Sequence, residues 1–176
     1  MNAEPLILHS HSERANEFNT VVEVAGVSIT LRAMSLEDLP QVVALEAQSH
    51  LEPWTQHAFR AELETSLVAQ PLVALFNEEI VGYVVPWFVA DELQIANLTV
   101  KESFRQKGLG RMLLAHTLAR AEQRRCRIAY LEVRDSNVAA RRLYASMGFV
   151  VEGVRPKYYG RGQEDAVLMK KELLVA

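Results

Sequence analysis

The sequence predicts an α/β or α+β domain in which helices cover both faces of one sheet. Two kinds of apolar pattern lead to this prediction. Short segments are continuously apolar or alternate apolar with polar residues, as strands do, and longer segments repeat apolar residues every three to four positions, as amphipathic helices do. Strands and helices are mixed along the chain, an order that favours a sheet covered by helices. A length of 176 residues fits one domain.

The domain is expected to begin at about residue 27. Residues 1–26 show neither period over any length, and we interpret them as an N-terminal extension, with one possible added strand at 21–24. From residue 27 the pattern is clearer, because apolar and polar residues alternate over 27–32, as in a half-buried strand. We therefore divide the chain into an extension, 1–26, and a domain, 27–176.

Two helices are predicted after this strand. Ser35 and Asp38 have the spacing of a capping box, and apolar residues follow at helical spacing to about Gln48. Thr55 can cap a second helix that extends to about Leu67. Both helices have one apolar face, which we expect to pack on the sheet.

The middle of the chain predicts three strands. Apolar runs at 72–76 and 80–88 flank the polar turn 77–79, which is typical of a hairpin. Pro86 lies inside the second run and indicates a bulge or an edge position. Residues 93–100 form the third run.

The same patterns predict the elements of the C-terminal part. They are a helix at 109–125, a strand at 127–134, a short helix from Ser136 or Asn137 to Met147 that stops at Gly148, and strands at 149–154 and 166–174 around a polar loop.

Composition excludes several classes of protein. The net charge of −3 argues against a broad basic face for nucleic acid. The single cysteine, Cys126, excludes an internal disulfide framework and suits a reducing compartment. No apolar run reaches the length of a membrane span, and the first residues lack the charge and apolar run of a signal peptide. We expect a cytoplasmic protein, a monomer or weak dimer that binds neither nucleic acid nor membrane.

The segment 105–110, R-Q-K-G-L-G, is the strongest functional signal. A glycine loop between a buried strand and a helix presents unpaired backbone N–H groups at the positive end of the helix dipole, which suits a phosphate or pyrophosphate. Gly108 and Gly110 let the backbone approach such an anion, and Arg105, Lys107 and Arg111 add positive charge.

Further motifs follow this loop in a characteristic order and spacing. The set comprises L-T-V at 98–100, the glycine loop, L-E-V-R at 131–134, Asn137, L-Y at 143–144 and M-G-F at 147–149, with P-W at 53–54 before them and Y-Y at 158–159 and E-D at 164–165 after them. The chain resembles the Gcn5-related N-acetyltransferase (GNAT) superfamily, from about residue 27 to the end. Within it, the chain is most similar to the bacterial ribosomal-protein alanine N-acetyltransferases.

This resemblance implies the GNAT fold, with a mixed, mostly antiparallel sheet of about seven strands, helices on both faces and a splayed parallel pair that receives acetyl-coenzyme A. The backbone of 98–100 would bind the pantetheine and polarise the thioester carbonyl, the N–H groups of 106–111 would hold the pyrophosphate, and the Asn137 side chain would hold the pantetheine arm. The residues expected to bind the coenzyme are Leu98, Thr99, Val100, Arg105, Gln106, Lys107, Gly108, Leu109, Gly110, Arg111 and Asn137.

Glu132 and Tyr144 are the candidate general base and general acid. An α-amine has a pKa of about 8 and is mostly protonated at neutral pH, so a carboxylate that takes its proton is useful. A phenol stays protonated there and can donate to the leaving thiolate. Their alternatives are structural: an ion pair of Glu132 with a nearby arginine, and a core position for the Tyr144 ring.

The resemblance also suggests that Trp54, Tyr158 and Tyr159 contact the acceptor, an N-terminal alanine of a ribosomal protein. Trp54 is equally consistent with a position in the core. The alternative for the two tyrosines is packing at the sheet edge. No metal is expected, since no ligand cluster accompanies His9 and His11.

Three other functions are weighed against this one. A dinucleotide-binding oxidoreductase would use the same G-x-G with Glu132 at the ribose, but Leu113 stands where a third glycine is needed and too little chain follows. A non-catalytic coenzyme A-binding module would not need both Glu132 and Tyr144. A GNAT enzyme acting on a small amine or a lysine side chain is the third.

Overall fold

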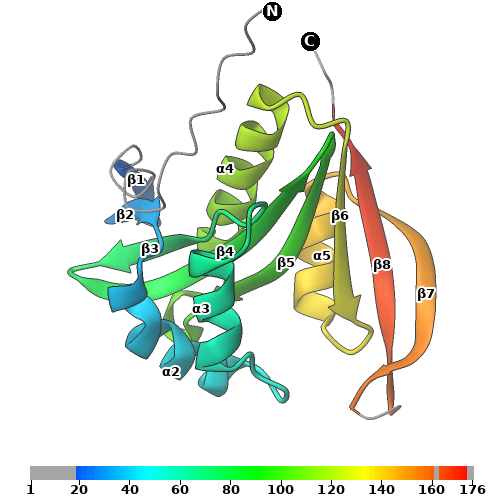
Figure 1. The fold of residues 1–176 in the computed structure, drawn as a ribbon, viewed down its shortest axis with the longest axis horizontal. Helices are drawn as coiled ribbons and strands as arrows, with labels where there is room; N and C mark the ends of the chain where they lie inside the picture. Colours follow the sequence, from blue (N-terminus) through cyan, green and yellow to red (C-terminus); the bar gives the residue numbers. More distant parts are fainter. Residues whose placement is uncertain (1–18, 161–162, 174–176) are drawn as a thin grey trace, which may run out of the picture.

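The computed structural model describes residues 19–160 and 163–173, which form eight strands, four α-helices and two short 3-10 helices. In chain order they are β1 (Asn19–Val24), β2 (Val27–Ala33), η1 (Leu36–Asp38), α2 (Leu39–Ser49), α3 (Gln56–Glu64), β3 (Leu72–Phe76), β4 (Glu79–Val89), β5 (Glu92–Val100), η2 (Glu102–Phe104), α4 (Leu109–Gln123), β6 (Ile128–Arg134), α5 (Val138–Ser146), β7 (Val150–Tyr159) and β8 (Glu164–Glu172) (Figure 1).

These strands form one open sheet in the order β1-β2-β3-β4-β5-β6-β8-β7. Every neighbouring pair is antiparallel except β5 and β6, which are parallel. The predicted mixed, mostly antiparallel sheet is therefore confirmed, with eight strands rather than about seven. The additional strand is β1, which pairs with β2 in continuous register from Asn19 opposite Arg32 to Val24 opposite Val27.

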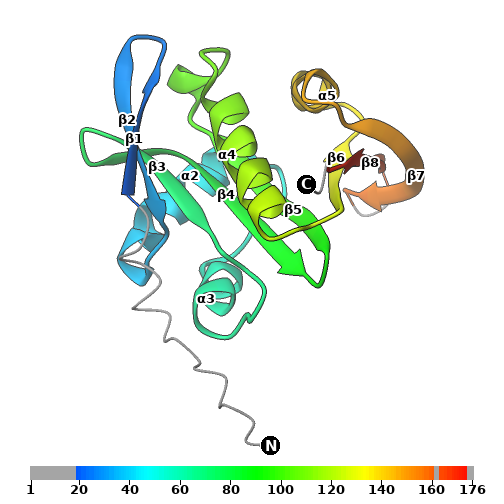
Figure 2. The same ribbon diagram turned by 90° about the horizontal axis from the view of Figure 1, so that it is seen from above.

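Helices cover both faces of this sheet, as Figure 2 shows. One core lies under α2 and α3 and includes Leu39, Val42, Phe59, Tyr83 and Val85. The other lies under α4 and α5 and includes Leu109, Leu113, Leu118, Leu131 and Tyr144. Alternation along the strands supplies both cores, since successive side chains of a strand point to opposite faces.

The parallel pair separates after four residue pairs. β5 and β6 are in register from Glu92 opposite Ile128 to Ile95 opposite Leu131, and beyond this point the two strands diverge (Figure 1). A bulge lies at the same place: Pro86 of β4 faces Ile95 and Val85 faces Asn97, so Ala96 is an extra residue in β5. The bulge predicted from Pro86 is confirmed.

The extra residue changes which side chains of β5 face each core. Leu93 and Ile95 pack in the core under α4, and after Ala96 it is Leu98 and Val100 that pack there. The side chains of Asn97 and Thr99 consequently point to the α2 face, where they contact Glu46 and His50.

Local sequence signals explain where the helices begin. The Asp38 carboxylate accepts hydrogen bonds from the Ser35 N–H and hydroxyl, at 2.7 and 3.1 Å. The first turn is the 3-10 helix η1, so Pro40 falls in the first turn of α2, where its missing N–H costs no hydrogen bond. Thr55 Oγ1 accepts from Ala58 N at 3.1 Å and caps α3.

Several predicted boundaries were wrong. The helix α3 ends at Glu64 rather than near Leu67, because the Thr65 hydroxyl bonds back to the Ala61 carbonyl and the chain turns. The helix α4 ends at Gln123 rather than 125, because Arg125 adopts a positive φ of 60°. The last strand was predicted to end at 174, and that residue lies outside the described residues, as does the part of the extension at 1–18.

The largest difference concerns β7. It was predicted to end at 154 in a polar loop, but it continues to Tyr159 alongside β8, which begins at Glu164. Register shifts between Val151 and Gly153 and between Arg155 and Tyr159 let the strand bend past Pro156. Tyr158 and Tyr159 are therefore strand residues and not loop residues.

Asp38 generates a prediction about stability. Burial raises the pKa of Asp38, but hydrogen bonds from Arg32 and Ser35 outweigh it and hold the pKa below its ordinary value. Asp38→Asn is expected to lower the free energy of unfolding at pH 7 by about 1–3 kcal/mol. Because the folded-state pKa is depressed, this stabilisation is present above about pH 4 and is lost as pH falls through the folded value.

Urea unfolding at pH 7 and pH 3 checks this, with Glu37→Gln, an exposed neighbouring carboxylate, as control. An equal loss for both variants at pH 7, or a loss from Asp38→Asn that does not shrink at pH 3, would contradict it.

Candidate active site

The glycine loop before α4 has the geometry of an anion site. Gly108 is the N-cap of α4 with φ of +92°, a left-handed conformation that favours glycine. The first backbone bond of the helix runs from Met112 N to Gly108 O at 2.9 Å, so the N–H groups of residues 109–111 have no acceptor within the helix. These groups and the helix dipole favour an anion at this position.

A glycine is needed at position 110 for a different structural reason. A Cβ at this position would lie 3.3 Å from Leu143 Cδ2 and 3.6 Å from Val100 Cγ2. The small residue therefore lets α4 approach α5 and β5 closely. For Gly108, by contrast, a Cβ would meet nothing within 4 Å, so its requirement is the positive φ.

The basic side chains near the loop also contact neighbouring elements. Arg105 donates from Nε to Val100 O at 3.0 Å and lies 3.4 Å from Ser49 Oγ, which connects the end of β5 to the end of α2. Arg111 donates to Ser146 Oγ at 2.7 Å, which connects α4 to α5. The Lys107 ammonium lies 5.6 Å from the centre of the Phe104 ring.

The segment 98–100 lies after the bulge, on the part of β5 that has left β6. In the part of the chain that the structure describes, no strand pairs with this edge of β5 beyond Ile95. Asn137 caps α5, since its Oδ1 accepts from Ala140 N at 3.1 Å. With Oδ1 engaged in the cap, the side-chain N–H groups of Asn137 are the part of the amide that can bind a ligand, as donors.

Glu132 and Tyr144 lie on opposite sides of β6. Glu132 points to the α2 face, and its Oε1 is 2.7 Å from a guanidinium nitrogen of Arg155 on β7. Tyr144 packs with Leu131 and Val133 in the core under α4 and α5. Burial, followed by the nearby Tyr159 hydroxyl, raises the pKa of Tyr144 to about 12. Its hydroxyl is thus a proton donor at every physiological pH.

Both alternative interpretations of these two residues also match contacts in the structure. Glu132 makes the ion pair with an arginine that a structural role requires. The Tyr144 ring lies 6.0 Å from the Phe149 ring inside the core. A structural role for each residue is therefore supported by a contact in the structure.

Arginines and tyrosines gather on the α2 face of β6 and β7. The Tyr158 and Tyr159 rings are 5.0 Å apart, edge to face, and the Arg134 guanidinium lies 4.2 Å from the centre of the Tyr159 ring. Burial, followed by the Glu132 charge, raises the pKa of Tyr159. Of the predicted site residues, the structure thus brings Glu132, Tyr158 and Tyr159 together.

An ion-pair network connects this cluster to the loop between α2 and α3. Arg134 contacts Glu52 at 2.6 Å and Glu164 at 3.0 Å. Glu52 also accepts from Gly160 N at 3.1 Å. The network holds the α2–α3 loop next to the β7–β8 hairpin.

Trp54 packs against the core on the α2 and α3 side. Its ring is half-buried and lies 5.4 Å from the Phe59 ring. Its backbone N–H donates to Glu46 at 2.9 Å. The core interpretation of Trp54 therefore has direct structural support.

Glu46 is the site residue that the sequence analysis missed. It is only 1% exposed, and it accepts hydrogen bonds from the Tyr83 hydroxyl, Asn97 Nδ2 and Trp54 N. Its signal was visible, because Glu46 stands seven residues after Leu39 and four after Val42 on the apolar face of α2, where a charged residue is rare.

The fold, the glycine loop and the residues around β6 define an acetyltransferase of the GNAT class. The chain belongs to this family: residues 39–149 match the model of the acetyltransferase (GNAT) family. As a member, it is an acetyl-coenzyme A-dependent N-acetyltransferase, and the predicted cosubstrate is confirmed.

Three individual proteins are similar to this chain over most of its length. A protein of Salmonella typhimurium named ribosomal protein bS18-alanine N-acetyltransferase is 34% identical over 142 residues, which are 80% of this chain and 95% of the relative. The crystal structure of the Escherichia coli ribosomal-protein-S18-alanine N-acetyltransferase has a TM-score of 0.77 at 31% identity and covers 84% of this chain and 96% of its own. Ard1 from Thermoplasma volcanium has a TM-score of 0.76 at 28% identity, over 83% of this chain and 98% of its own.

The described residues contain neither a membrane-spanning helix nor a cluster of metal ligands. No helix among them is long and apolar enough to span a membrane. Residues 19–160 and 163–173 contain no group of three or more His, Cys, Asp or Glu side chains placed to hold a metal ion.

The buried Glu46 carboxylate generates a second stability prediction. Glu46→Ala is expected to lower the free energy of unfolding by about 3 kcal/mol or more, because the buried Tyr83 hydroxyl and Asn97 amide lose their acceptor. Glu64→Ala is the matched control, since Glu64 is exposed and pairs with Arg60 across one helical turn. The loss of free energy of unfolding from this variant should stay within about 0.5 kcal/mol. Similar unfolding midpoints for the two variants in urea would refute this prediction.

Proposed function

We propose that the enzyme acetylates the α-amine of a protein N-terminus, with an N-terminal alanine of a ribosomal protein as acceptor. The observation that carries this proposal is the similarity, above 30% identity over four fifths of the chain, to proteins named ribosomal protein bS18-alanine N-acetyltransferase. A protein N-terminus also suits the chemistry, because its pKa of about 8 leaves far more neutral amine at pH 7 than the 10.4 of lysine.

In the proposed reaction, the coenzyme lies where β5 and β6 separate. Its pyrophosphate occupies the N–H groups of residues 106–111, with Arg105, Lys107 and Arg111 around it, and its pantetheine follows the backbone of 98–100 and the Asn137 amide. The unpaired edge of β5 after Ile95 and the orphan N–H groups at the start of α4 support this placement.

Transfer is direct in this proposal. Glu132 accepts the proton of the incoming ammonium, and the neutral amine attacks the thioester carbonyl. The second proton of the nitrogen is then released toward solvent, the carbon–sulfur bond breaks as Tyr144 donates its proton to the coenzyme thiolate, and solvent reprotonates Tyr144. Glu132 and Tyr144 lie on opposite sides of β6, which supports a division of the two proton transfers between acceptor and leaving group. Tyr158 and Tyr159, beside Glu132, would contact the first residues of the acceptor.

Substitution of the two catalytic groups tests the mechanism. Glu132→Gln and Tyr144→Phe are each expected to lower kcat by about 10²- to 10⁴-fold while the Kd for acetyl-coenzyme A changes little. Raising the pH toward 9 should partly restore Glu132→Gln, because more of the amine is then already neutral. Steady-state kinetics and calorimetric titration measure both quantities, and an unchanged kcat in both variants would assign these residues a purely structural role.

Competition between two peptides of one sequence tests the acceptor. One carries a free N-terminal alanine and an acetylated lysine, and the other a blocked N-terminus and a free lysine. Mass spectrometry of the mixture after limited turnover is expected to show acetyl groups on the alanine peptide first. Faster transfer to the lysine peptide, or to spermidine added with both, would replace the N-terminal acceptor by a side-chain or small amine.

A further inference from the structure

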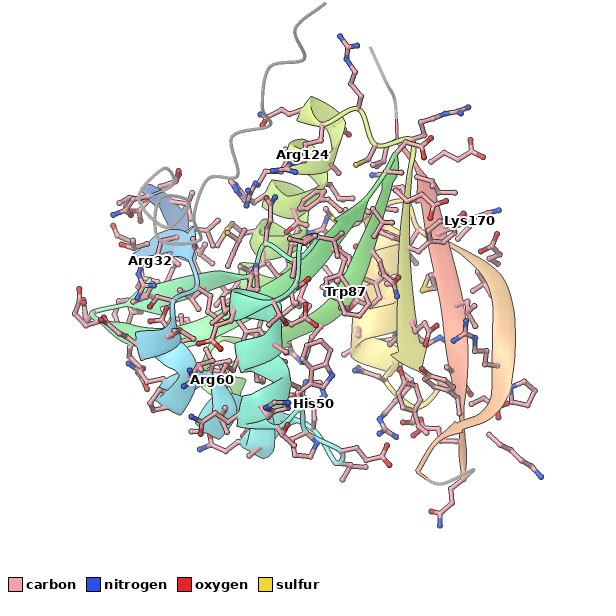
Figure 3. All side chains as sticks on the ribbon, viewed as in Figure 1. Arg32, His50, Arg60, Trp87, Arg124 and Lys170 are labelled. Atoms are coloured by element: carbon pink, nitrogen blue, oxygen red, sulfur yellow. The ribbon has the colours of Figure 1, made fainter. Side chains whose placement is uncertain are left out.

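His50 stands at the end of α2, on the acceptor side of the strand separation, and the proposed reaction does not yet use it. Its side chain is labelled in Figure 3. Its Nε2 atom lies 2.7 Å from Thr99 Oγ1 and 3.3 Å from Glu46 Oε2. Thr99 belongs to the segment 98–100 after the bulge, so His50 lies one side chain away from the proposed position of the thioester.

The hydrogen bonds around His50 have a defined direction. Asn97 donates from Nδ2 to the Glu46 carboxylate at 3.1 Å, and this contact turns the Asn97 carbonyl oxygen toward Thr99. The Thr99 hydroxyl donates to that oxygen at 3.3 Å. The Thr99 oxygen then accepts, and we assign the ring proton of His50 to Nε2, which also lies 3.3 Å from the acceptor Glu46 Oε2. The remaining ring nitrogen, Nδ1, consequently carries the lone pair.

The surroundings favour a neutral ring that can become charged. Burial, together with the positive charges of Arg134 and Arg105, lowers the pKa of His50 against the opposing effect of Glu46. These groups come from four parts of the fold: Glu46 from α2, Thr99 from β5, Arg134 from β6, and Arg105 from the loop before α4. The side chain is one-third exposed, so an acceptor can reach it.

We propose that His50 is a second proton acceptor of the enzyme: after Glu132 has taken the ammonium proton, Nδ1 of His50 takes the proton that the nitrogen must still lose after its attack, while Thr99 and Glu46 position the ring. The inference rests on the proposed transfer to an amine. The remaining surplus N–H bond of the attacking nitrogen breaks, its electron pair stays on nitrogen as the amide forms, and a new N–H bond forms on Nδ1. The resulting imidazolium faces the Glu46 carboxylate and returns the proton to solvent after product release.

The ion pair of Glu132 gives this second acceptor a function. Arg155 lies 2.7 Å from the Glu132 carboxylate and competes with a proton for it. His50 has no such competitor on Nδ1 in the network described above, and its hydrogen bonds orient it in advance. The two groups approach the acceptor from different elements, His50 from α2 and Glu132 from β6.

The test compares His50→Asn with His57→Asn, an exposed histidine on α3 as matched control. The assay uses whichever amine the wild-type enzyme acetylates among the alanine peptide, the lysine peptide and spermidine. His50→Asn is expected to lower kcat by about 10²-fold and to remove the acid limb that the titration of His50 adds to the kcat–pH profile. His57→Asn should keep both the rate and the profile.

Chemical rescue separates a proton-transfer role from a structural one. Imidazole added to His50→Ala is expected to restore part of kcat, with the Kd for acetyl-coenzyme A unchanged. His50→Gln, which can still donate to Thr99 but has no basic nitrogen, should keep the melting temperature and remain slow. A kcat–pH profile of His50→Gln that superimposes on the wild type, or no response of His50→Ala to imidazole, overturns the proposal.

The same data distinguish this inference from the proposed function. Transfer to lysine or spermidine instead of alanine would overturn the acceptor assignment. The ratio of kcat of the His50 variant to kcat of the wild type, measured on that amine, would still decide the role of His50. A slow Glu132→Gln beside an unaffected His50→Gln would leave Glu132 as the single base.

Discussion

The separation of β5 from β6 is the constraint on which the rest of the structure depends. Four residue pairs hold the parallel strands together, and the pairing ends beside the extra residue Ala96. Beyond this point no strand among the described residues pairs with that edge of β5. The bulge turns Asn97 and Thr99 to the α2 face, so one inserted residue directs polar side chains to the place where the sheet opens.

The two faces of β6 lie in chemically different environments, because successive side chains of a strand point to opposite faces. Glu132 and Arg134 project among charged and aromatic side chains, with Tyr159 and Arg155 as neighbours. Leu131 and Val133 project into the core that surrounds Tyr144. One environment is polar and partly exposed, and the other raises the pKa of a phenol to about 12. Because its side chains alternate, this short strand has a carboxylate on one face and a protonated hydroxyl next to the other face.

The buried Glu46 ties the α2 helix to this arrangement. A carboxylate removed from water is costly unless several donors compensate it, and here the donors come from β4, β5 and the α2–α3 loop. Any slip of α2 along the sheet would leave the charge unsatisfied. The hydrogen-bond chain from Glu46 through Asn97 and Thr99 to His50 therefore has one well-defined arrangement, and it ends beside the proposed acetyl position.

The sequence by itself determined what depends on short-range interactions. The caps at Ser35, Thr55 and Asn137, the bulge at Pro86 and the glycine loop before α4 need only neighbours along the chain, and the order of motifs predicted the family. Only the tertiary structure decided which distant residues meet. Glu46 finds Asn97, Arg134 finds Glu52 and Glu132 finds Arg155 because the helices and the bent strand β7 pack in one particular register. The physical reason is that the spacing of apolar residues in a segment indicates which face of that segment is buried. It does not indicate the partner of a buried charge, which depends on how all the elements pack on the sheet.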